Sequence, residues 1–319
     1  MKRQHGAALL AAMLTVTLVA TFAASALWQQ WRSVEVESAD RQRVQSGWIL
    51  TGALDWARLI LREDRGDPDY LAEPWAVPLE EARLSTFLAA DANNNAMGEN
   101  ADADQVFLSG DITDLQSRLN VTSLVRAGAQ NDSALKAFGR LFELLALPPQ
   151  QLTTLAENLR FASDIGTDNR SADRAPLLPQ RVEQLVWLGL TPDTVAALQP
   201  FVTILPQITA VNANTAPAEV LYAVLPGISL ADAQRLVSER ERQHFRSSDD
   251  LKRLLPPDTT IDRTAIGTGS NFFEVRGRLR IDDIVIEEHS VVHRQGREVR
   301  TLQRERGASE AAGTTEIKR

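Results

Sequence analysis

The chain begins with a short basic leader followed by a long apolar run. Lys2 and Arg3 precede Gly6, and residues 7–28 contain no Asp, Glu, Lys or Arg. A run of about 20 apolar residues is long enough to cross a bilayer as a helix. Because flanking cations stay on the cytoplasmic side, the pattern predicts a single-pass membrane anchor with a cytoplasmic N-terminus and the bulk of the chain outside the cytoplasm.

The helical pattern continues beyond this run. Apolar residues recur at helical spacing up to Leu61, and no proline occurs before Pro68. We therefore predict one helix from about residue 7 to about residue 61, whose second half packs on a soluble domain through an apolar stripe. The stripe comprises Ile49, Leu50, Ala53, Leu54, Trp56, Ala57, Ile60 and Leu61.

Residues 132–255 have the apolar spacing of short helices and contain an internal repeat. Two units about 38 residues apart share the order helix, glycine turn, helix. In each, glycine suits a left-handed helix end and a hydroxyl residue can cap the next helix. The matched pairs are Pro179 and Pro217, Gly189 and Gly227, and Thr191 and Ser229.

The last part of the chain alternates between apolar and polar residues. This alternation predicts strands at residues 273–281, 284–288, 290–294 and 298–304, with Gly296 in a hairpin turn. The strands form a small antiparallel sheet, which the second half of the first helix covers. The pattern as a whole is that of an α+β fold with a large all-α segment.

Composition adds three exclusions. The net charge of -8 and the pI of about 5.2 argue against a general nucleic-acid binder, which needs a basic stripe. The chain has no cysteine, which excludes disulfides and thiolate metal sites. The common catalytic motifs are missing, so we expect a protein that is not an enzyme.

The junction at Gly6 resembles the type III signal of type IV pilins and type II secretion pseudopilins. In that family a prepilin peptidase cuts after the glycine, here between Gly6 and Ala7. Most members carry a glutamate at the fifth mature residue, where this chain has Ala11. That carboxylate pairs with the free amine of a neighbouring subunit. Its absence is typical of minor pseudopilin K and suits a subunit at the tip of a filament.

Three further segments resemble the minor pseudopilin K family: residues 73–76 (EPWA), 114–120 (DLQSRLN) and 212–216 (NANTA). The resemblance implies a pilin-like helix and sheet interrupted by an all-α domain with two helix-turn-helix repeats of the SAM or helix-hairpin-helix kind. The implied parts are a leader (1–6), a transmembrane half-helix (7–28), a pilin-like domain (29–125 and 266–306), the inserted domain (126–265) and a disordered tail (307–319).

The resemblance also implies a function and partners. The chain would initiate and cap the type II secretion pseudopilus during protein export. Its partners would be minor pseudopilins I and J, with H as a further candidate, the prepilin peptidase and the inner-membrane secretion platform, and no nucleic acid.

Two acidic clusters are candidate Ca²⁺ sites, because Ca²⁺ prefers several oxygen ligands. Asp91, Asn93, Asn95 and Asp102 partly match an EF-hand loop, although Ala96 stands where that loop needs glycine. The second cluster is Asp164, Asp168 and Asp173, and the resemblance implies calcium in such a loop. The alternative for both is a solvated acidic loop.

Two other functions remain open on the sequence alone. The second helical unit resembles a helix-hairpin-helix, which would make the chain a membrane-anchored DNA-uptake protein. A basic face of Arg235, Arg240, Arg242 and Lys252 would support that function, while the nearby acidic residues would repel phosphates. A minor pilin of a type IV pilus is the other alternative.

Overall fold

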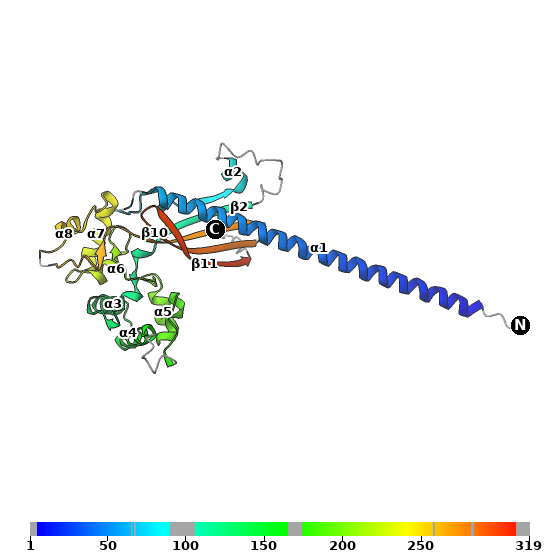
Figure 1. Ribbon diagram of the computed structural model, residues 1–319, viewed down its shortest axis with the longest axis horizontal. Coiled ribbons are helices and arrows are strands. Elements are labelled where there is room, and N and C mark those ends of the chain that lie inside the picture. Colours follow the sequence, from blue (N-terminus) through cyan, green and yellow to red (C-terminus); the bar gives the residue numbers. More distant parts are fainter. Residues whose placement is uncertain are drawn as a thin grey trace, which may run out of the picture. The chain divides into compact units, whose positions relative to one another are not determined.

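The computed structural model describes residues 5–64, 66, 68–89, 106–164, 174–257, 259–281 and 284–310. Its first element is α1 (His5–Glu63), which confirms the predicted long helix (Figure 1). By length and composition α1 could cross a membrane, since its apolar part has a mean hydropathy of 2.0. The chain divides within this helix: residues up to Ala53 form one unit, and the chain from Leu54 onward forms a second.

The second unit contains a five-stranded antiparallel sheet with the order β1-β2-β9-β10-β11. Its strands are β1 (Leu79–Arg83), β2 (Val106–Asp114), β9 (Phe272–Ile281), β10 (Ile284–Gln295) and β11 (Glu298–Glu310). Because Asp114 pairs with Phe273, the chain leaves the sheet and returns to it at the same end. The α+β class and the antiparallel sheet are therefore confirmed.

Two strands differ from their predicted bounds. The segments expected at 284–288 and 290–294 form the single strand β10. β11 continues to Glu310, so the first residues of the expected tail pair with β10, while residues 311–319 lie outside the described part.

The end of α1 that belongs to the second unit covers one face of the sheet. Leu54, Ala57 and Leu61 are buried there against Trp75 and Phe273. The remaining members of this core are Val275, Val292 and Val299. The predicted stripe is buried at Leu50, Leu54, Ala57 and Leu61, half-buried at Ile49, Ala53 and Ile60, and 43% exposed at Trp56, which the prediction wrongly placed in the core. Trp56 lies one residue from the buried position 57, about 100° around a helix of 3.6 residues per turn.

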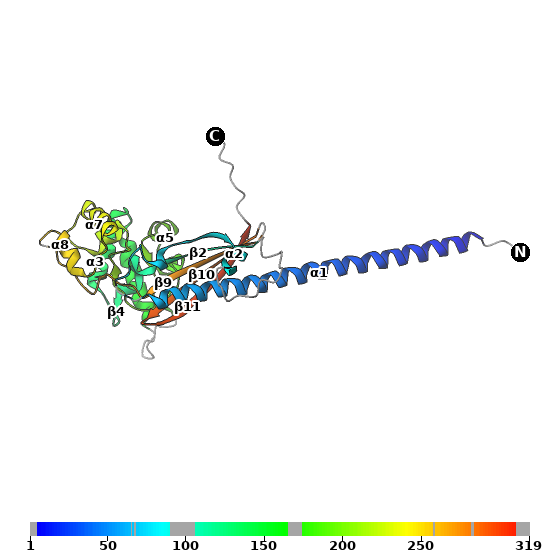
Figure 2. The same ribbon diagram turned by 90° about the horizontal axis from the view of Figure 1, so that it is seen from above.

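Between β2 and β9 lies a helical region, at one end of the sheet in both views (Figures 1 and 2). Its main helices are α3 (Asp132–Leu144), α4 (Pro149–Ser163), η6 (Val182–Leu188), α5 (Pro192–Leu198), α6 (Ala218–Val224), α7 (Leu230–Arg242) and α8 (Ser248–Leu254). The short elements are η3 (Leu115–Ser117), β3 (Leu119–Asn120), η4 (Val121–Leu124), β4 (Val125–Arg126), β5 (Ala129–Gln130), β6 (Val202–Thr203), β7 (Val211–Asn212) and β8 (Ile266–Gly267). Outside the region are η1 (Pro74–Ala76) and α2 (Leu84–Ala89).

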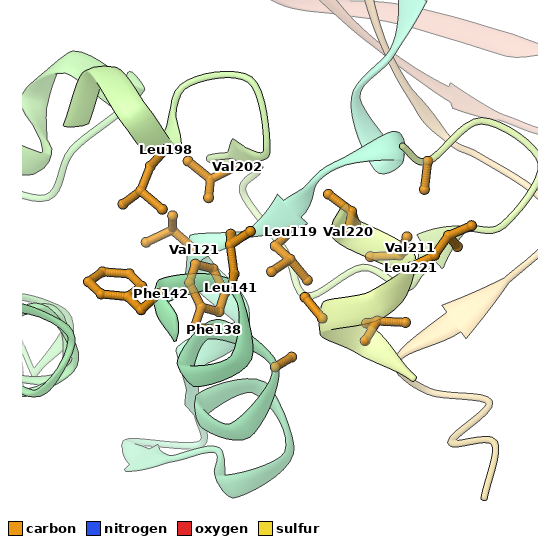
Figure 3. Close-up of a cluster of buried hydrophobic side chains, with 14 of the residues drawn as sticks. Leu119, Val121, Phe138, Leu141, Phe142, Leu198, Val202, Val211, Val220 and Leu221 are labelled. Atoms are coloured by element: carbon orange, nitrogen blue, oxygen red, sulfur yellow. The ribbon is translucent and has the colours of Figure 1, made fainter. Parts of the chain in front are cut away.

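One apolar core unites the helical region. Phe138, Leu141 and Phe142 of α3 lie at its centre, beside Val121 and α6 (Figure 3). The cluster draws buried residues from Leu119 to Ile266, so the region has a hydrophobic interior of its own.

The internal repeat is confirmed. We call η6 with α5 the first module and α6 with α7 the second. Gly189 and Gly227 both have positive φ, 95° and 81°. Thr191 and Ser229 then cap the next helix, accepting from the backbone N–H three residues later at 3.4 and 3.1 Å. The first helix of the first module is 3-10 rather than α.

The two glycines provide a matched test of this turn. Alanine at either position is strained by about 1 kcal/mol because its Cβ disfavours positive φ. A Cβ on Gly189 would also lie 2.7 Å from Cγ2 of Thr154, whereas nothing lies within 4 Å of one on Gly227. We expect Gly189→Ala to lower the free energy of unfolding by about 1 kcal/mol more than Gly227→Ala. Urea denaturation measures both, and equal losses would contradict the packing at Gly189.

Candidate functional site

A buried polar network lies where the sheet meets the helical region. We call Asp69, Asp114, Asn212, Ser270 and Arg294 the polar junction. They come from the loop after α1, the end of β2, β7, the segment before β9 and the end of β10. All five are at most 3% exposed. Buried polar groups are costly unless they are hydrogen-bonded, so the partners of each determine what the junction does.

Asp114 accepts four hydrogen bonds. Its Oδ2 accepts from Oγ1 of Thr215 at 2.5 Å, Oγ of Ser270 at 2.6 Å and Nδ2 of Asn212 at 3.0 Å. Its Oδ1 accepts from the backbone N–H of Gln116 at 2.7 Å. Burial raises the pKa of Asp114, and these hydrogen bonds oppose the rise. One carboxylate thereby joins the end of β2 to the segment that leads into the second module and to the segment before β9.

Arg294 provides the positive charge of the junction. Its Nη2 donates to both carboxylate oxygens of Asp69, at 2.6 and 2.7 Å, and to the carbonyl of Ser270 at 2.8 Å. Its Nη1 donates to Asp64. The backbone N–H of Ser270 also donates to Asp69, at 2.7 Å. Burial nevertheless raises the pKa of Asp69 to about 7.

Asp64, Asp69 and Glu73 bring carboxylate oxygens within 4.8 Å of one another, as a metal site would. Protein donors already engage them, however. Arg294 binds the two aspartates, and Glu73 accepts from the backbone N–H of Tyr70 at 3.0 Å and from Nε1 of Trp75 at 2.7 Å. We therefore interpret the cluster as part of the polar junction.

Amide side chains extend the junction into the helical region. Nε2 of Gln116 donates to the carbonyl of Ala210 at 3.0 Å. Nδ2 of Asn120 donates to the carbonyl of Gln207 at 2.7 Å. Asn214 exchanges two hydrogen bonds with the backbone of Phe245, at 2.8 and 2.9 Å. The segments 73–76, 114–120 and 212–216, singled out in the sequence, thus meet in one place.

The predicted processing and tip residues lie at the start of α1. Gly6 and Ala7 are in its first turn, and Ala11 is exposed. Of the two candidate calcium clusters, only Asp164 is described, as an exposed residue directly after α4. The others lie outside the described residues: Asp91, Asn93, Asn95, Asp102, Asp168 and Asp173.

Comparison with known proteins assigns the chain to a family. Two family models, both described as type II secretion system (T2SS), protein K, match residues 117–207 and 211–269. Type II secretion system protein K of Pseudomonas aeruginosa PAO1 is 27% identical over 305 residues, covering 88% of this chain and 86% of that protein. The protein of the same name from Pectobacterium carotovorum is 26% identical, covering 96% and 97%.

The chain belongs to the type II secretion system protein K family.

The fold agrees with this assignment. A chain in the crystal structure of the GspK-GspI-GspJ complex from enterotoxigenic Escherichia coli matches with a TM-score of 0.63 and 19% identity. The match covers 85% of this chain and 99% of that one. The residues matched by the two family models together span the helical region. They include Asn212 of the polar junction and Asn120, which extends it. The protein is thus a minor pseudopilin of a type II secretion system, a component of protein transport.

The three arginines that DNA binding would require already bind carbonyl or carboxylate groups of the chain itself. Arg240 donates at 2.5 and 2.8 Å to two backbone carbonyls at the entry of the second module, and burial lowers its pKa to about 10. Arg235 and Arg242 pair with acidic neighbours at 3.1 and 3.3 Å. The backbone N–H of Ser229, which a phosphate would require, donates to Asp232 at 3.0 Å. These contacts argue against the alternative.

The raised pKa of Asp69 predicts a pH-dependent stability. Between about pH 4 and pH 7 the folded state binds a proton at Asp69 that the unfolded state has lost, so the free energy of unfolding falls as pH rises through this window. Asp69→Asn should flatten the slope, which is at most about 1.4 kcal/mol per pH unit for one group. It should also lower overall stability, because Arg294 Nη2 donates to both carboxyl oxygens of Asp69 and an amide offers it only one.

Urea denaturation of wild type and Asp69→Asn at several pH values between 4 and 7 measures this slope. Asp193→Asn, at an exposed carboxylate of α5, is the control and should keep the wild-type slope. An unchanged slope in Asp69→Asn would contradict the assignment of the titration to Asp69.

Proposed function

We propose that this protein occupies the tip of the type II secretion pseudopilus, where it initiates and caps filament assembly. The observation that carries the proposal is Ala11. After cleavage at Gly6 a pilin-like subunit has a free amine at Ala7, which needs a carboxylate in the low dielectric of the membrane. Ala11 offers no carboxylate to the amine of another subunit, so no subunit needs to stand ahead of this one. Its role would be architectural rather than enzymatic.

The helical region supports the same position. We infer that it is a domain inserted into a pilin-like fold, with the boundaries 126–265 predicted from the sequence. Its attachment at one end of the sheet, between β2 and β9, is consistent with that inference. A bulky domain there would obstruct a further subunit stacked beyond that end.

The proposal includes a membrane orientation and a processing step. The N-terminus would be cytoplasmic, the bulk periplasmic, and the prepilin peptidase would remove residues 1–6. We expect a bulky residue at Gly6, as in Gly6→Leu, to leave an uncut precursor that still inserts into the inner membrane. N-terminal sequencing of the mature wild-type protein should begin at Ala7, and any other start would contradict the cleavage site.

Partners follow from the likeness to the GspK-GspI-GspJ complex. We infer that minor pseudopilins I and J bind this chain, with H as a further candidate, and that the secretion platform engages it during assembly. The contacts would be an apolar surface of α1 and the edge strand β11. Trp48 and Trp56 of α1 are 73% and 43% exposed, so each offers a large aromatic side chain to a partner.

We expect the soluble part, without residues 1 to about 30, to form a complex with the soluble domains of pseudopilins I and J. Light scattering of the mixture measures its mass. Trp56→Ala should weaken the complex about tenfold or more, because a large aromatic contact is lost. Val77→Ala, at a residue that is 65% exposed just before β1, should not weaken it. A persistent monomer would contradict the partner proposal, and labelled protein found evenly along filaments would contradict the tip position.

Calcium binding by Asp164, Asp168 and Asp173 stays a proposal. The exposed position of Asp164 after α4 leaves its carboxylate at the surface, as a loop site needs. Binding would raise the thermal midpoint when calcium is added. A shift that persists in the double variant Asp168→Ala, Asp173→Ala would remove the site.

A further inference from the structure

The first module leaves four large apolar residues uncovered. Leu177 and Leu178 precede η6 and are 71% and 47% exposed, while Val186 and Trp187 within it are 38% and 45% exposed. We call these four residues the module surface. Single exposed apolar residues are ordinary, but two apolar pairs so near in the chain, with a tryptophan among them, suggest an interaction site.

In the second module, the corresponding positions are buried inside the helical region of the same chain. At the offset of about 38 residues, the four positions correspond to Thr215, Ala216, Val224 and Leu225. These are only 8%, 0%, 8% and 1% exposed. Ala216, Val224 and Leu225 belong to the core of the helical region, and α3 packs on α6. The same module is therefore covered by protein in one copy and left open in the other.

The charges around the module surface favour a protein as its occupant. Arg181, between the two apolar pairs, forms an ion pair with Glu305 at 3.0 Å. Glu183 accepts from Nε2 of Gln199 at 3.1 Å. One positive and one negative group thus lie between the two apolar pairs in the chain, each with a partner inside the protein, whereas a nucleic acid or an anionic lipid would need a surplus of cations. An apolar centre with a polar rim is the usual anatomy of a protein interface, and tryptophan is enriched at its strongest points.

The same ion pair joins the module surface to the edge of the sheet. Glu305 belongs to β11, the outermost strand of the five-stranded order. Leu302 of that strand is 48% exposed at a β-bulge opposite Val291 and Val292. A protein lying against β11 would therefore extend over Arg181 and reach the module surface.

We propose that the module surface is a second docking site for the pilin-like subunit that lies against β11, which buries Trp187 beneath an apolar part of its own globular domain. This inference rests on the proposed function, because it takes the occupant to be a neighbouring minor pseudopilin. It adds that the inserted helical region takes part in partner binding in addition to obstructing the tip.

The test uses the full chain in detergent with the full-length pseudopilins I and J of the same secretion system as the probe. The chain has no cysteine, so a single introduced thiol reports on one position. Val186→Cys should react with a maleimide at least about tenfold more slowly in the complex than alone. Val77→Cys, just before the opposite edge strand β1, is the matched control and should react equally in both.

A second variant measures affinity. Trp187→Ser removes the largest side chain of the module surface and should weaken the complex at least about tenfold, with an unchanged thermal midpoint for the chain alone. If wild type forms the complex while Val186→Cys stays equally reactive and Trp187→Ser binds equally well, the docking site is overturned and the proposed function stands. If wild type forms no complex, the proposed partners themselves are wrong, and the docking site falls with them.

Discussion

The arrangement of this protein depends on the buried ion pair between Arg294 and Asp69. The chain leaves the sheet at Asp114 and returns near Ser270, so a large helical region is connected to the sheet through two adjacent strand ends. Such a region could swing about its two connections. Arg294 at the end of β10 opposes this through Asp69, because it binds the Asp69 carboxylate and the Ser270 carbonyl, while the carbonyl of Asp69 accepts from Nδ2 of Asn212 in β7 at 3.1 Å. Removing one partner of such a buried pair leaves an uncompensated charge, at a cost of about 3–5 kcal/mol.

The hydrogen bonds around this pair give the junction its specificity. Asp114 accepts from Gln116, Asn212, Thr215 and Ser270, which come from separate parts of the chain. Losing one donor would leave a buried acceptor short of a partner, at about 1–3 kcal/mol. Apolar side chains can shift slightly against one another at little energetic cost. The hydrogen bonds around Asp114 instead require each donor to stay at a defined distance and direction. The segments by which the chain resembles minor pseudopilin K thus have a physical role, because they hold the inserted region to the sheet.

Local signals in the sequence were enough to predict α1, the repeat and its glycine turns, because periodicity and caps act over a few residues. Long-range pairs left no such signal. Arg294 finds its partners Asp64 and Asp69 about 225 residues away. The sequence also predicted two strands where β10 is one. Glu288 and Ser290 are buried at positions that normally hold apolar residues, so the apolar alternation is lost there. Glu288 is 3% exposed, and Arg304 and Arg306 of the neighbouring strand pair with it.

The same reasoning explains why DNA binding stayed open as an alternative on the sequence alone, and why the module surface was missed. Arg235, Arg240 and Arg242 look like a basic face until their carbonyl and carboxylate partners are known. Trp187 looks like a core residue, because its counterpart Leu225 is one.

The two modules have the same sequence pattern but unequal surroundings. Asn212, Asn214 and Thr215 fix the second module at its entry, so its apolar side is held against α3. The first module is joined to the sheet through Arg181 and Glu305 at the surface, which leaves Trp187 available. Because the junction already immobilises the helical region, a partner that binds there has little further ordering entropy to overcome.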